Sequence, residues 1–129
     1  MTAYGVLAVG LGAALGAWLR WLLALWLNPT FPDLPLGTLA ANLVGGYMVG
    51  VAVAYFGERA GVPVEARLFV ITGFLGGLTT FSTFSAETVA LLARAQYGWA
   101  AGIIASHLAG SILMTIFGML TVKWLGSLA

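Results

Sequence analysis

The sequence lacks cysteine and has few charged residues, and both shortages narrow the functions that the chain can have. Without cysteine there is no disulfide, no thiolate nucleophile and no cysteine-based metal site. The single histidine cannot make a multi-histidine metal site within one chain. Only 7% of the 129 residues are charged, whereas a soluble domain has about 25%. The chain therefore cannot cover a water-facing surface, and its formal net charge of +1 argues against nucleic acid as a partner.

Hydrophobic residues dominate instead, at 61% of the chain with a mean hydropathy of +1.03, which is typical of an integral membrane protein. About 20 apolar residues cross the hydrocarbon core of a bilayer. The sequence predicts four such spans, at about residues 2–26, 37–56, 68–93 and 99–125. Pro29, Pro32 and Pro35 end the first span. We therefore expect residues 1–129 to form a single all-α membrane domain of four transmembrane helices, beginning with a span and not with a removed signal peptide.

Lysine and arginine are shared almost evenly between the two ends of the predicted spans. One end has Arg59, Arg67 and Lys123, and the other has Arg20 and Arg94. Without a positive-inside bias the chain can insert both ways up, and the two forms can pair as an antiparallel, dual-topology homodimer. Glycines four residues apart predict close helix contacts. These pairs are Gly12/Gly16, Gly46/Gly50, Gly73/Gly77 and Gly98/Gly102.

The third span contains a polar, glycine-rich stretch at residues 73–85, GFLGGLTTFSTFS, where a lipid anchor would be uniformly apolar. A Gly-Gly step weakens a helix. In hydrocarbon, a helix break persists only where the freed backbone groups face protein, water or an ion. The sequence therefore predicts a third helix that is broken near the membrane centre, at a functional site.

Polar side chains are rare within the spans, and each has a structural and a functional interpretation. Asn42 either joins two helices by hydrogen bonds or donates its amide to an anion. Glu87, the only carboxylate well inside a span, is either a satisfied structural residue or a functional acid. Arg20 is either an interfacial anchor beside two tryptophans or a group that attracts anions at a vestibule.

The fourth span carries a polar stripe at four-residue spacing, formed by His107, Ser111 and Thr115. The stripe is either hydrogen-bonded packing or part of an ion path. Phe81 and Phe84 are either packing residues or ring edges, which are electropositive and hold a small anion without the full charge that would slow its release. The sequence has no catalytic Ser/His/Asp order, P-loop or paired carboxylates, so we expect that the protein is not an enzyme.

The segment GFLGGLTTFSTFSAET at residues 73–88 resembles the core motif of the Fluc (CrcB) family of fluoride channels, as do GTLAANLVGG at 37–46 and GAWLR at 16–20. The resemblance covers essentially the whole chain, and the motifs follow one another in the same order as in the family. It implies an antiparallel, dual-topology homodimer with two pores, each built from both subunits. Such a dimer exports toxic fluoride passively across a membrane, by default the bacterial inner membrane.

The resemblance also implies roles for individual residues of the fluoride path. By motif position, Phe81 and Phe84 match the phenylalanines that line it, and Asn42 matches the pore asparagine. His107 stands where some members of the family have serine. The polar residues implied along the path are Thr83, Glu87, Ser111 and His107.

Outside the path, the resemblance places Arg20 at a wide aqueous vestibule. It matches Gly76 and Thr79 to positions whose backbone carbonyls hold a structural sodium ion at the dimer interface. Oxygen ligands of this kind suit a small, hard cation. The sodium ion would add a positive potential near the path of the anion.

Two other functions are compatible with four spans. A small multidrug-resistance-like, proton-coupled antiporter also has four spans and dual topology. It needs a membrane-central acid in its first span, where the only ionisable side chain here is Arg20. A non-transporting membrane accessory protein differs from a channel in that replacing Phe81 and Phe84 would leave its partner bound.

Overall fold

The computed structural model describes residues 2–128, which fold entirely into helices and turns, without a strand. Four helical spans are long and apolar enough to cross a membrane, Ala3–Thr30, Leu36–Gly57, Val64–Ala93 and Tyr97–Ser127. The expectation of an all-α protein with four candidate membrane spans is therefore confirmed.

Asparagine and proline residues shape the turn between the first two spans. These spans consist of α1 (Ala3–Leu27), the 3-10 turn η1 (Asn28–Thr30) and α2 (Leu36–Gly57). Pro29 lies in the first turn of η1, and Pro35 directly precedes α2. The Asn28 side-chain oxygen accepts the backbone N–H groups of Gly37 and Thr38, at 2.8 and 3.2 Å. The end of α1 thus satisfies N–H groups that have no partner within α2.

The third span is continuous in sequence but irregular in conformation. It consists of α3 (Val64–Arg67), the π-helix η2 (Leu68–Leu75), α4 (Gly76–Leu78) and α5 (Phe81–Ala93). The chain is extended at Thr79 (φ −82°, ψ 153°) and Thr80 (φ −151°, ψ 121°). The Gly76-Gly77 step, expected to weaken the helix, is itself helical. The interruption follows it, at the two threonines.

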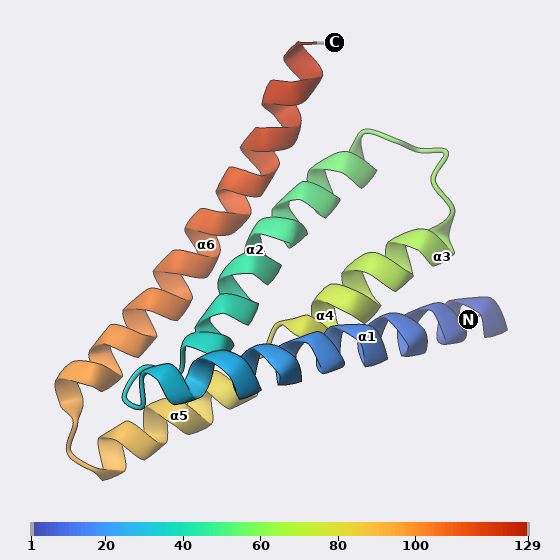
Figure 1. Cartoon of the computed structure of the whole chain (residues 1–129). Coiled ribbons are helices and arrows are strands. Elements are labelled where there is room, and N and C mark those ends of the chain that lie inside the picture. Colours follow the sequence, from blue (N-terminus) through green and yellow to red (C-terminus); the bar gives the residue numbers. More distant parts are fainter. Residues whose placement is uncertain (1, 129) are drawn as a thin grey trace.

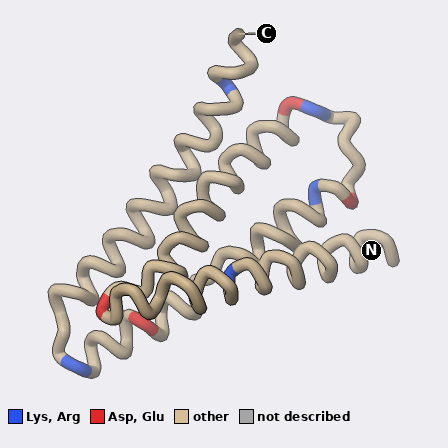
Figure 2. The backbone as a smooth tube through the Cα atoms, in the orientation of Figure 1, with Lys and Arg blue, Asp and Glu red and all other residues tan. Residues whose placement is uncertain are grey.

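The four spans form two pairs (Figure 1). α1 runs beside η2 and α4 in the same direction, whereas α2 runs back beside α6 (Tyr97–Ser127). Successive spans therefore alternate in direction, as repeated crossings of a membrane require. Leu75 and Leu78 are fully buried and pack with Ala41 and Ala52 of α2, which joins the two pairs. Most charged residues gather near the ends of the spans (Figure 2).

Glycines set the separation within each pair of helices. A Cβ atom added at Gly16 of α1 would lie 2.0 Å from the Phe74 carbonyl oxygen, and one at Gly50 of α2 would lie 2.0 Å from the Thr115 carbonyl oxygen. Other glycines that would meet backbone atoms at 3.0 Å or less are Gly12, Gly37, Gly46, Gly73, Gly77 and Gly118. At Gly98 and Gly102 a Cβ would meet nothing within 4 Å. Three of the four predicted glycine pairs therefore make close contacts, and the fourth makes none among the residues that the structure describes.

Replacing Gly16 with alanine should separate α1 from the third span. Overpacking a close contact costs about 1–3 kcal/mol, so we expect the Gly16→Ala protein to unfold at a lower temperature in detergent than the wild type. Gly10→Ala is the matched control on the same helix, because a Cβ there would meet nothing within 4 Å. Equal unfolding temperatures for Gly16→Ala and Gly10→Ala would contradict the close contact.

Candidate functional site

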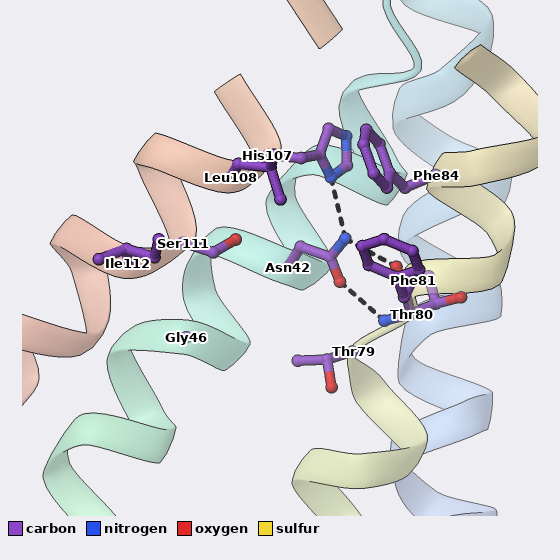
Figure 3. Close-up of a pocket in the computed structure, with 10 residues that line it drawn as sticks. All are labelled: Asn42, Gly46, Thr79, Thr80, Phe81, Phe84, His107, Leu108, Ser111 and Ile112. Atoms are coloured by element: carbon purple, nitrogen blue, oxygen red, sulfur yellow. Dashed lines mark hydrogen bonds between the residues drawn. The ribbon is translucent and has the colours of Figure 1, made fainter. Parts of the chain in front are cut away.

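The side chain of Asn42, on α2, binds the backbone of the interruption in the third span. The Thr80 N–H donates to the Asn42 side-chain oxygen at 2.7 Å, and the Asn42 amide donates to the Thr80 carbonyl at 2.9 Å. Figure 3 shows both bonds on one face of Asn42. Backbone groups away from water need such partners. The structural interpretation of Asn42, as a link between two spans, is therefore realised in this chain.

Asn42 also contacts His107, on α6. The Asn42 side-chain nitrogen lies 2.9 Å from His107 Nδ1 (Figure 3). His107 is buried, with 3% of its surface exposed, and its ring stacks on that of Phe84 with centroids 4.7 Å apart and an interplanar angle of 27°. Three spans thus meet at one asparagine.

A cavity of about 300 Å³ lies beside this link. It is lined by Asn42, Gly46, Thr79, Thr80, Phe81, Phe84, His107, Leu108, Ser111 and Ile112 (Figure 3). The lining is uncharged and comes from α2, α5, α6 and the interruption. Five residues that the resemblance implies for an ion path are together here. They are Asn42, Phe81, Phe84, His107 and Ser111.

The two phenylalanines of the cavity differ in their surroundings. Their rings meet edge to face, with centroids 5.3 Å apart and an interplanar angle of 69°. Phe84 is buried at 6% exposure, whereas Phe81 is 71% exposed. A large apolar ring that lines the cavity is therefore left mostly exposed by this chain.

Glu87 lies outside the cavity lining and is held by a residue that the sequence analysis did not single out. Its Oε1 accepts a hydrogen bond from the Thr38 hydroxyl at 2.6 Å. Its Oε2 is buried without a hydrogen-bond partner among residues 2–128. Thr38 lies one helical turn before Asn42, and that spacing is the signal that could have identified it.

The remaining polar residues of the predicted site connect neighbouring segments. Thr83 accepts a hydrogen bond from the Thr80 hydroxyl at 3.1 Å. Arg20 donates its Nε–H to the Gly77 carbonyl at 3.0 Å, which ties α1 to α4. The hydroxyl of Thr115 donates to the Gly46 carbonyl at 3.0 Å. The predicted polar stripe of α6 is thus divided, because His107 and Ser111 line the cavity while Thr115 packs against α2.

The interruption frees several backbone carbonyls from their helical partners, among them those of Gly76 and Thr79. The N–H that would bond the Gly76 carbonyl in a helix belongs to Thr80, and it donates to Asn42 instead. The N–H that would bond the Thr79 carbonyl belongs to Thr83, and it donates to the Thr80 hydroxyl at 3.1 Å. These are the two residues whose carbonyls the resemblance implies as cation ligands. Within residues 2–128 no cluster of three His, Cys, Asp or Glu side chains offers another metal site.

Comparison with known proteins extends over nearly the full chain. Residues 7–119 match the family described as "CrcB-like protein, Camphor Resistance (CrcB)". A protein of Nitrosospira multiformis is 66% identical over 125 residues, which are 97% of this chain and 98% of the relative. A protein of Thiobacillus denitrificans is 61% identical over 97% of this chain and 99% of its own length. Both relatives are named "Fluoride-specific ion channel FluC".

Replacing Asn42 with aspartate should destabilise the protein through the loss of two donors. The carboxylate keeps an acceptor for the Thr80 N–H but faces the Thr80 carbonyl and His107 Nδ1 without hydrogen atoms to share. Each buried polar group left unpaired costs about 1–3 kcal/mol, so we expect a clearly lower unfolding temperature in detergent. The control is Ser106→Ala, which removes a hydroxyl that bonds only the Gly102 carbonyl of its own helix. Wild-type stability of Asn42→Asp would rule out the bonds to Thr80 as a main constraint.

Proposed function

The chain belongs to the CrcB family, and we propose that it is a fluoride-selective channel through which fluoride leaves the cell passively, protecting the cell from its toxicity. The observation that carries the proposal is the cavity that brings Asn42, Phe81, Phe84 and Ser111 together. Full-length relatives at 66% and 61% identity are named as fluoride-specific channels. Those names also indicate a non-enzymatic membrane protein of bacteria.

The chemistry of fluoride agrees with an uncharged lining. Fluoride is small and strongly hydrated, so a pore must replace its water with several donors and still release it. A neutral hydroxyl and the electropositive edges of several aromatic rings together replace the water around the ion, and none of them carries a full charge that would retain it. Because the Asn42 amide is engaged with Thr80 and His107, we assign to it the shaping of the cavity wall. The Ser111 hydroxyl and the ring edges of Phe81 and Phe84 then face the ion.

The route beyond the cavity follows the other polar residues. Thr83 and Glu87 extend it along α5, with Thr38 supporting Glu87 at 2.6 Å. Arg20 stands at the vestibule. Its Nε–H bonds Gly77, so the guanidinium is anchored in place while its other N–H groups draw anions towards the entrance.

A second copy of the chain completes each pore in an antiparallel, dual-topology homodimer. The polar groups of Asn42, Thr80 and Ser111 at the cavity support this arrangement, because polar groups that face lipid need partners or a cover, which a second copy supplies. The near-equal sharing of lysine and arginine between the two ends supports insertion in both orientations. The interruption at Thr79 and Thr80 then lies near the membrane centre, as a broken third helix.

A structural sodium ion joins the two subunits at the twofold axis. The Gly76 and Thr79 carbonyls of both copies are its proposed ligands, and the diversion of their helical partners to Asn42 and Thr80 supports this assignment. Hard oxygen ligands suit sodium. When bound, the ion supplies positive potential near the anion path without a mobile side chain.

Fluoride efflux from loaded liposomes, measured with a fluoride electrode and with valinomycin to release the counter-charge, tests the channel. We expect fast fluoride loss and no matching chloride loss. The double variant Phe81→Ile, Phe84→Ile should lose fluoride efflux by about tenfold or more, because isoleucine has no electropositive ring edge to face the ion.

The control for this experiment is Phe117→Ile, which replaces an exposed ring of α6 outside the cavity and should leave efflux unchanged. Normal fluoride efflux in the double variant would contradict the assignment of the phenylalanines. No efflux from well-dispersed wild-type protein would contradict the channel and favour an accessory role.

Sodium should stabilise the dimer specifically. A ligand that binds only the folded state at 100 times its Kd adds about 2.7 kcal/mol. We expect a higher unfolding temperature in sodium chloride than in potassium chloride or N-methylglucamine chloride at equal ionic strength. Identical unfolding temperatures in the three salts would argue against the sodium site.

A further inference from the structure

A second and larger cavity lies where the start of α1 runs beside α3 (Figure 1). Its volume is about 640 Å³. The residues that line it are Thr2, Gly5, Val6, Val9, Val64, Glu65 and Leu68. None of them lines the cavity beside Asn42 or belongs to the proposed ion path. We call this cavity the α1–α3 groove.

The walls of the α1–α3 groove are mostly apolar and open to the surroundings of the chain. Val6 and Val64 are 54% and 65% exposed. Gly5 is buried between the two helices, and a Cβ atom there would lie 3.3 Å from Leu68 Cδ1. In a bilayer, a hollow of this kind contacts a lipid acyl chain from two sides and gains more dispersion contacts than a flat helix surface does.

The groove lies at the level of the lipid head groups. The first and third spans begin beside it, α1 directly after Thr2 and α3 directly after Pro63. Tyr4, in the first turn of α1, is 75% exposed, and exposed tyrosines of membrane proteins concentrate at the membrane–water interface. A lipid chain in the groove would therefore have its head group beside the start of α3.

A single carboxylate gives the groove its charge. Glu65 is the only charged residue among the described residues of the lining, and it is half-buried. The Thr2 hydroxyl already accepts a backbone N–H of α1 at 3.1 Å. Arg67, two residues after Glu65, donates instead to the Arg59 carbonyl at 2.7 Å. Apolar walls with one carboxylate at head-group level are complementary to an amphiphile with a cationic head.

We propose that the α1–α3 groove binds one acyl chain of a phospholipid whose head group carries a primary ammonium, and that this ammonium donates to the Glu65 carboxylate. The bound lipid ties the start of α1 to α3. A primary ammonium has three N–H donors, whereas the quaternary nitrogen of choline has none. An anionic head group would be repelled by the carboxylate. This inference is independent of the proposed channel function.

Three phospholipids with identical acyl chains separate the head-group contact from the chain contact. Phosphatidylethanolamine, phosphatidylcholine or phosphatidylglycerol is added to the full chain in detergent, and the lipid-bound fraction is measured by native mass spectrometry. We expect phosphatidylethanolamine to bind about fivefold more tightly than phosphatidylcholine, as a partly exposed ion pair allows, and phosphatidylglycerol to bind most weakly. Equal binding of the first two lipids, or tightest binding of phosphatidylglycerol, would overturn the proposal.

Replacing Glu65 with glutamine should remove the head-group preference and keep the chain contact. We expect Glu65→Gln to bind phosphatidylethanolamine about fivefold more weakly than the wild type, with unchanged binding of phosphatidylcholine. Glu58→Gln is the matched control, because Glu58 follows the end of α2 and lies outside the groove. A Glu65→Gln protein that still prefers phosphatidylethanolamine would show that Glu65 does not bind the head group.

Filling the groove tests the contact with the acyl chain. Val6→Phe places a ring in the wall, so we expect this variant to lose binding of all three lipids. Val53→Phe is the control, because Val53 is 45% exposed on α2 and lies outside the groove. Unchanged lipid binding by Val6→Phe would contradict the groove as the site. The comparison of lipids on the wild type requires no variant, so it decides if a variant aggregates.

Fluoride efflux is a separate readout, because Glu65 lies outside the proposed ion path. We expect Glu65→Gln to conduct fluoride as the wild type does in phosphatidylcholine liposomes. A wild type that conducts fluoride but does not prefer phosphatidylethanolamine contradicts only the lipid site. A wild type that prefers this lipid but does not conduct contradicts only the channel.

Discussion

The pair of hydrogen bonds between Asn42 and the Thr80 backbone is the interaction on which the rest of the site depends. A membrane span can leave the helical path only if the freed N–H and C=O groups find partners. Asn42 supplies both partners from one side chain, at 2.7 and 2.9 Å. Because the Thr80 N–H is bound there, the Gly76 carbonyl loses its helical donor. Because the chain restarts as α5 at Phe81, the two phenylalanines face the cavity beside Asn42.

The glycines at the helix crossings let neighbouring spans approach closely enough for the polar contacts of the site to form. α1 approaches the third span so closely that a single methyl group at Gly16 would lie 2.0 Å from a carbonyl oxygen. That approach brings Arg20 within reach of the Gly77 carbonyl. On the other pair, Gly50 and Thr115 meet in the same way, which holds His107 of α6 against Asn42 of α2. The glycines thus set the separation between helices, and that separation brings the polar side chains within hydrogen-bonding distance of their partners.

The sequence predicts the four spans well, because hydropathy and the prolines after α1 act locally. The family motif also assigns Asn42, Phe81, Phe84, His107 and Ser111 to one path, and in the structure these five residues line one cavity. The position of the interruption differs from the expectation. The contact with Asn42 places it at Thr79 and Thr80, although the Gly76-Gly77 step has the lower helix propensity. Spacing along α2 places Thr38 one turn from Asn42, but it cannot reveal that Thr38 bonds Glu87, which lies 49 positions away on another span. Gly98 and Gly102 match the small-residue pattern, but among residues 2–128 an added Cβ there would meet no other helix within 4 Å, since the pattern does not encode which helix lies opposite.

The absence of formal charge from the cavity lining has a consequence for the proposed channel. In a low-dielectric site, one fixed ammonium or guanidinium would bind fluoride strongly and slow its exit. Arg20, the cation of the first span, is hydrogen-bonded to the Gly77 carbonyl. The donors that line the cavity are neutral. Each neutral donor is weak and directional, so the ion is stabilised only where several point at one place. Selectivity of the proposed channel against a larger anion then depends on how rigidly those donors are oriented, and the bonds between Asn42 and the Thr80 backbone fix the wall of the cavity that carries them.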